Sequence, residues 1–312
     1  MRAVAGPGRW VWAVSGLVTA AVLAVPGARL ITLTGGPSNV QVQPQAIMIR
    51  TLTVPQPVTS LTVQSYGGQV QVMAGPVSRV HVTETIMYDS PGGVVSAVPE
   101  PVSGGRPSQA DGNQAAGVPA VPESVSGGRL SLGDPACASS DCAVNFSLTV
   151  PFGVTVSVAT QGGPVAVSGV AGANLDTGGG PASATLIGGP LTVTTGGGPL
   201  VVRGVAGPLR ADTDGGTLTA QDIASATATV TTGGGAAMVT FAAAPRSVSV
   251  STDGGAAVVA VPGGPYAVTA DSNGGPQSVA IATDPAAYAL ITVTSGGGPL
   301  RIEPAPVTAG PS

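Results

Sequence analysis

The sequence predicts an all-β fold, a two-sheet parallel β-solenoid of about 18-residue coils, preceded by an N-terminal transmembrane helix. Two observations predict the solenoid. A Thr/Ser-x-Gly-Gly-like turn recurs eight times within residues 156–302, and apolar residues alternate with polar ones between the turns. An uncharged apolar run near the N-terminus predicts the helix. The last glycine of each turn, called the origin glycine below, is Gly163, Gly180, Gly198, Gly216, Gly235, Gly255, Gly275 or Gly298.

Four positions in each repeat predict the core. The positions seven and five before the origin glycine, and two and four after it, are aliphatic in every repeat except at Gln277. Because side chains alternate across a strand, the intervening positions face water. Each coil therefore holds two short strands that enclose a thin core. One coil buries too little apolar surface to offset its ordering entropy, so the coils must stack.

The composition agrees with a repetitive fold. The chain has 48 Gly and 29 Pro, and only 3% of its residues are aromatic, which does not describe two ordinary globular cores. All the basic residues are arginines scattered singly, and the net charge is −4. Since no basic stripe could neutralise phosphates, nucleic acid is excluded as a partner.

The N-terminal region predicts export. Residues 1–9 predict a short cytoplasmic tail, and residues 10–30 predict a transmembrane signal anchor. Two arginines precede the apolar run and one, Arg29, follows it, which places the N-terminus inside and the C-terminal domain outside the cytoplasm, in a single-pass protein of the cell membrane. Secretion after signal cleavage is the alternative, although Pro26 disfavours a cleavage site here.

The rest of the chain divides into four regions. Residues 31–88 predict N-terminal strands and a first coil around Gly68. Residues 89–143 predict a disordered insertion rich in Pro, Gly and Ser, where the similar sequences VPEPVSGGR and VPESVSGGR should not form strands. Residues 144–303 predict the solenoid. Residues 304–312 predict a Pro-rich tail that ends strand pairing at the C-terminal edge.

The two cysteines of the insertion, Cys137 and Cys142, are a disulfide candidate in an exported chain. Two free thiols or half of a metal site are the alternatives. A zinc site would need two more ligands, and the chain offers only His81. The turns also lack the carboxylates of a calcium-binding β-roll. The sequence therefore predicts no metal and no cofactor.

Polar columns beside the turns admit two interpretations. The residue three before each origin glycine is Thr or Ser, which predicts either a binding ladder or hydroxyls that stabilise the turn; the second is favoured. The residue two before it is mostly Gly, Asp or Asn, which predicts a left-handed backbone there and explains Asp214 and Asp253 without catalysis. Asp176 and Asp212 share an outward column, and we interpret them as solvated surface acids.

The outward column three after the origin glycine is less polar than its counterpart on the other sheet. It contains Val201, Met238 and Val258, which we predict as a possible contact face.

The sequence LTVPFGVTVSVATQGGPVAVSGVAGANLDTGGG, residues 148–180, resembles the bacterial putative-adhesin family, a domain of unknown function found in β-solenoid envelope proteins. In that family a strand ending in Val-Pro leads into units of the form V-x-V-x-T-x-x-G-x-V-x-V. The resemblance covers about residues 61–302 apart from the insertion. It implies a solenoid outside a bacterial membrane and carries over no catalytic residue.

Together these features favour a non-catalytic, membrane-anchored extracytoplasmic β-solenoid, an adhesin-like scaffold or interaction protein of the bacterial envelope. Its expected partner is a protein or glycan at the cell surface. One alternative is an accessory component of an envelope-stress sensing system. The other is a carbohydrate-active enzyme that would use Asp176 or Asp212.

Overall fold

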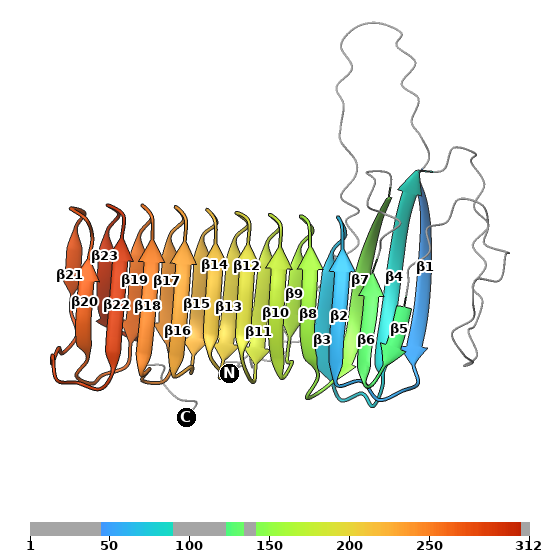
Figure 1. Cartoon of the computed structure of the whole chain (residues 1–312), viewed down its shortest axis with the longest axis horizontal. Helices are drawn as coiled ribbons and strands as arrows, with labels where there is room; N and C mark the ends of the chain where they lie inside the picture. Colours follow the sequence, from blue (N-terminus) through green and yellow to red (C-terminus); the bar gives the residue numbers. More distant parts are fainter. Residues whose placement is uncertain (1–44, 90–122, 134–141, 307–312) are drawn as a thin grey trace, which may run out of the picture. The chain divides into compact units, whose positions relative to one another are not determined.

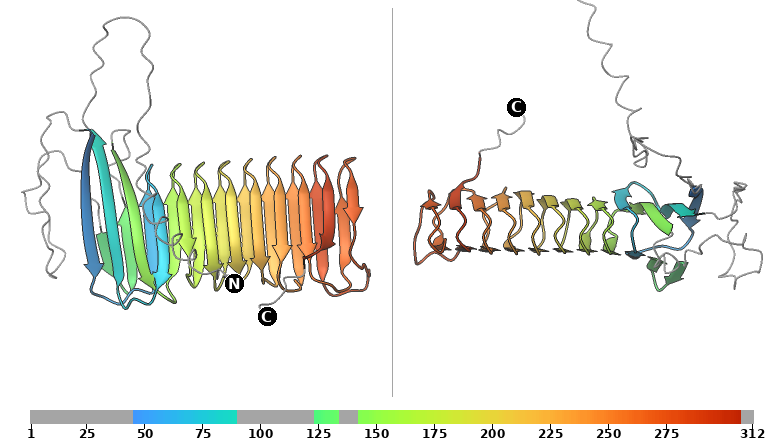
Figure 2. Two further views of the ribbon diagram at one scale, coloured as in Figure 1. Left: turned by 180° about the vertical axis from the view of Figure 1, so that it is seen from behind. Right: turned by 90° about the horizontal axis from the view of Figure 1, so that it is seen from above.

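The computed structural model describes residues 45–89, 123–133 and 142–306, and every regular element within them is a β-strand. The strands form two sheets that face each other (Figures 1 and 2). Sheet A has 12 strands, in spatial order β1 (Gln45–Val54), β4 (Val80–Asp89), β7 (Cys142–Pro151), β3 (Val70–Gly75), β9 (Val165–Ser168), β11 (Ala182–Ile187), β13 (Leu200–Val205), β15 (Leu218–Ile223), β17 (Ala237–Phe241), β19 (Ala257–Val261), β23 (Leu300–Pro304) and β21 (Gln277–Val279). Sheet B has 11 strands, in spatial order β20 (Ala267–Asp271), β22 (Leu290–Ser295), β18 (Ser247–Thr252), β16 (Thr227–Thr232), β14 (Leu209–Thr213), β12 (Leu191–Thr195), β10 (Gly172–Thr177), β8 (Thr155–Thr160), β2 (Ser60–Ser65), β6 (Arg129–Gly133) and β5 (Glu123–Ser126).

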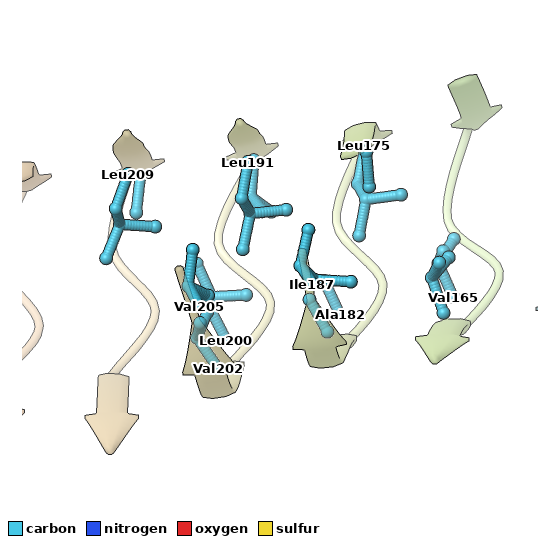
Figure 3. Close-up of a cluster of buried hydrophobic side chains, with 14 of the residues drawn as sticks. Val165, Leu175, Ala182, Ile187, Leu191, Leu200, Val202, Val205 and Leu209 are labelled. Carbon is cyan, nitrogen blue, oxygen red and sulfur yellow. The ribbon is translucent and has the colours of Figure 1, made fainter. Parts of the chain in front are cut away.

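Each coil is a sheet B strand, a glycine turn and a sheet A strand, as predicted. From β8 to β19 successive coils pair in parallel, with the aliphatic columns in register; Leu191 lies beside Leu209, and Leu200 beside Leu218. These side chains are at most 3% exposed and fill the space between the sheets (Figure 3). The predicted first coil is present too, since β2 and β3 pair in parallel with β8 and β9.

The hydroxyl column stabilises the turns and is not a binding ladder. In all eight repeats the Thr or Ser hydroxyl donates to the carbonyl of the origin glycine, at 2.5 to 2.9 Å. These hydroxyl residues are all buried. A buried hydroxyl cannot contact a sugar, so the structural interpretation is confirmed.

Thr213→Val should therefore lower the free energy of unfolding by about 1–3 kcal/mol, because the buried Gly216 carbonyl loses its hydroxyl donor while side-chain volume is kept. Thr213→Ser is the control and should stay close to the native chain, since Ser272 and Ser295 make the same bond. Chemical denaturation measures both variants. Equal losses in the two would contradict a role for the hydrogen bond.

Glycine is frequent two positions before the origin glycine for a different reason from the one predicted. In the column two before the origin, only Asn273 is left-handed (φ 47°). Gly178, Gly196 and Gly233 are required because a Cβ there would meet the backbone of the preceding coil. The origin glycines are required for the same reason, as at Gly216, where a Cβ would overlap the carbonyl oxygen of Gly198. Close stacking of the turns selects glycine.

The coils are not stacked in sequence order. The last coil along the chain, β22 and β23, lies between β18/β19 and β20/β21, so β20 and β21 form the end of the stack (Figure 1). The prediction that prolines from residue 304 onward end the pairing at the edge is wrong. Pro304 lies within β23 beside Val261 of β19, and Ala305 donates to the Val261 carbonyl. Gln277, the polar exception in the core columns, belongs to the end coil and is exposed.

Part of the predicted disordered insertion is ordered. The second duplicated sequence supplies β5, the turn and the first residue of β6, Arg129. The two strands form an antiparallel hairpin through Gly127 (φ 57°) and Gly128 (φ 78°). Two consecutive left-handed glycines make the tight turn that a hairpin needs. Parallel pairing of β6 with β2 buries Leu130 and Leu132, which supplies the apolar contact that the local sequence lacks.

Other predictions fall on residues that the structure does not describe. They include the cytoplasmic tail, the transmembrane segment of residues 10–30 and most of the insertion. Among the described residues, no helix is long and apolar enough to cross a membrane. Cys142 starts β7 and is disulfide-bonded, whereas its predicted partner Cys137 lies outside the described residues.

Candidate contact face

The predicted contact residues lie in one row on the outer face of sheet A. Val201 of β13 neighbours Thr219 of β15, Thr219 neighbours Met238 of β17, and Met238 neighbours Val258 of β19. Val201 is 39% exposed and Met238 46%, while Val258 is half-buried. Because adjacent strands lie about 4.8 Å apart, the row extends over about 14 Å of rigid sheet.

Arginines flank this row. The residue beyond Val258 is Arg301, not Ser278 as the chain order suggests, because β23 lies between β19 and β21. Arg203, the next outward residue on β13 after Val201, neighbours Thr185 and Gln221. The face therefore combines exposed aliphatic groups with guanidinium donors, which suits a partner that offers apolar groups and carboxylates.

The outer face of sheet B is polar. Asp176 and Asp212 lie in one row with Thr194 between them, as predicted, which is two strand spacings or about 9.6 Å. Asp176 is exposed and Asp212 half-buried. A shallow, open depression on the same face is lined by residues that include Ser60, Arg129 and Asn174. Neither acid lines that depression. Asp176 borders a second open depression with Gln64 and Gln161, but Asp212 lines neither, so the structure does not bring the two candidate acids to one concave site.

The other predicted site residues are not gathered together. His81 is exposed, with its Nδ1 atom 3.0 Å from the hydroxyl of Thr53. Within the described part of the chain, no three His, Cys, Asp or Glu side chains are close enough to hold a metal ion.

One cluster of charged residues, formed by Glu84, Arg50 and Glu123, was not predicted from the sequence. Glu84 on β4 is fully buried, and its carboxylate lies 3.7 Å from Arg50 of β1. Arg50 also pairs with Glu123 of β5, at 2.5 Å. Neither oxygen of Glu84 has a hydrogen-bond partner among the described residues. Alternation along β4 was the available signal, because it places Glu84 on the same side as the buried Val82 and Ile86.

Burial dominates the protonation of Glu84. Removal of the carboxylate from water raises the pKa of Glu84 from 4.5 to about 7; the Arg50 charge opposes this rise and the Glu123 charge adds to it. The residue therefore holds its proton to near neutral pH. The Arg50–Glu123 pair joins β1 and β5, the edge strands of the two sheets, at this end of the stack.

Comparisons with known proteins give a structural likeness only. No protein family and no curated protein matches the chain. A crystal structure from Parabacteroides merdae described as a putative adhesin has 12% identity and a TM-score of 0.49, over 82% of this chain and 95% of that one. A putative adhesin from Bacteroides fragilis has 10% identity and a TM-score of 0.46, over 83% and 96%. A putative lipid binding protein from Parabacteroides distasonis has 8% identity and a TM-score of 0.36, over 82% and 96%. These values assign neither a function nor a ligand to this chain.

Proposed function

We propose that this chain is a non-catalytic scaffold of the bacterial envelope, anchored by its N-terminal segment, that presents the outer face of sheet A to a protein or glycan at the cell surface. The observation that supports it most is the row of Val201, Met238 and Val258, held at fixed spacing by parallel strands. The uncharged run of residues 10–28 supports an anchored chain with its coils outside the cytoplasm.

Rigidity suits this role. Interior positions are filled by aliphatic side chains, and each glycine turn is fixed by an internal hydrogen bond. An interface built on such a scaffold loses little conformational entropy when it binds. Central apolar side chains bordered by arginine match the composition of protein-binding surfaces better than that of an active site.

The test measures binding of the full-length chain, in detergent, to isolated bacterial envelope fractions. Replacement of Val201, Met238 and Val258 by Ser together should weaken binding at least about tenfold. The control replaces Thr192, Thr229 and Ser249 by Ala, on the outer face of sheet B. Protease digestion on intact cells then shows whether the coils lie outside. Unchanged binding in the first variant, or a protected domain on intact cells, would refute the proposal.

A further inference from the structure

The end of the stack formed by β20 and β21 is an open cross-section of the core. In the adjacent coil, Ile291, Val293, Leu300 and Ile302 are at most 1% exposed. The corresponding side chains of the end coil are uncovered: Val268 and Ala270 are half-buried, Gln277 is exposed, and Val279 is 37% exposed. They line an open cavity of about 560 Å³ between the two edge strands. We call this surface the end face.

The backbone of the end face also offers free pairing edges. The Ala267 amide donates to Ala289 on the inner side of β20, so the Val268 peptide groups point away from the stack. The Ala280 amide donates to Ile302 on the inner side of β21, so those of Val279 point away too. Among the described residues both strands pair on one side only, and neither contains proline. Thr283 pairs with Tyr266 just before β20 and covers only the start of that outer edge. Such edges pair readily with another chain.

The opposite end of the stack is built differently. There β1 and β5 both pair antiparallel with their inner neighbours, whereas the coils pair in parallel. Arg50 lies at that end, paired with Glu84 and Glu123. If the end face packed against this opposite end, these charged groups would lose contact with water. The free energy of their desolvation would exceed the Coulombic attraction between them. Contact between two end faces brings the inward apolar side chains together, and the two edge strands carry a single charge, Asp271 at the exposed end of β20.

We propose that the end face binds the end face of a second copy of this chain, as a two-fold symmetric dimer. The two-fold axis brings the edge strands of the copies together as antiparallel neighbours, so both sheets continue across the interface. Such contact is self-complementary and closes after two copies, whereas end-to-opposite-end stacking would continue into a filament. The edges are only five and three residues long, so the dimer is a weak, concentration-dependent one. It does not depend on what the outer face of sheet A binds.

The test is sedimentation of the full-length chain in detergent over a wide concentration range. The native chain should dimerise reversibly. Val279→Lys should weaken dimerisation at least about tenfold, because it places a charge inside the interface. Met73→Lys is the control, since Met73 on β3 is an exposed apolar side chain (52%) far from the end face, and it should dimerise as the native chain does. Thermal unfolding of each variant checks that the fold is kept.

A second variant tests the symmetry. In the two-fold dimer, full pairing of β21 with its copy sets Ser278 opposite the same residue of the second copy, so mild oxidation of Ser278→Cys should give a covalent dimer. A native chain that stays monomeric at every concentration would overturn the proposal, whatever else covers the end face. So would a Val279→Lys chain that dimerises normally, or a Ser278→Cys chain that forms no covalent dimer.

Discussion

Replacement of Gly216 by alanine should lower the free energy of unfolding by about 3 kcal/mol or more, because the new methyl group has no space. A Cβ at Gly216 would overlap the carbonyl oxygen and carbon of Gly198 in the adjacent turn. These atoms belong to the backbone, so relief requires the two coils to separate, which stretches the ladder that pairs β13 with β15. Chemical denaturation of the purified chain measures the loss.

The neighbouring glycine provides the control. A Cβ at Gly215 meets nothing within 4 Å, and Gly215 is not in the left-handed region. Gly215→Ala should change stability by no more than about 0.5 kcal/mol, as a surface substitution usually does. If both alanine variants lose the same stability, glycine is needed for chain flexibility in the turn, and contact with the backbone of the adjacent coil is not the reason for glycine at position 216.

Replacement of Glu84 by glutamine should remove a pH dependence of stability that the native chain has. Below about 4.5, Glu84 is protonated in the folded and the unfolded chain. Between 4.5 and about 7 the folded chain keeps a proton that the unfolded chain has released, so stability falls as pH rises through this window. At about 1.4 kcal/mol for each pKa unit, the whole loss is on the order of 3 to 4 kcal/mol.

Denaturation of the native chain and of Glu84→Gln across that window measures the difference. The variant should gain stability relative to the native chain as the pH rises from 4.5 to about 7, with no further gain at higher pH, since its amide cannot ionise. Glu303→Gln, on the half-buried Glu303 of β23, is the control and should follow the native profile. Native and Glu84→Gln profiles that stay parallel would contradict the effect of burial on Glu84.

Sequence periodicity predicted the coil because each coil repeats the same local pattern. Alternation placed Val193 and Val202 inside and Val201 outside, and the structure confirms all three. The predicted reason for the glycines, a left-handed backbone, was wrong. A local pattern identifies the turn but does not show that the backbone of the neighbouring coil lies too close for a Cβ atom. The hairpin of β5 and β6 was missed since the burial of Leu130 depends on β2, which is distant in sequence.

The spatial order of the coils could not be predicted in the same way. When every coil has the same inward pattern, any two can stack, so local sequence does not specify which pair meets. Two features nevertheless distinguished the end coil. Gln277 breaks the aliphatic column, and the longest spacing, of 23 residues, follows Gly275. The extra residues form the loop between β21 and β22, which carries the chain back to pair with β18.

Because β22 and β23 lie between strands that are synthesised before them, the C-terminal part of the solenoid can assemble only after these two strands have been made. Strands β20 and β21 are made first, yet both sheets attach them only through β22 and β23. Until β22 and β23 leave the ribosome, the outer edges of β18 and β19 lack their native partners, and β20 and β21 lack the strands to which they attach in the folded chain. A chain that ends before β22 therefore keeps a loosely attached coil that a protease can recognise.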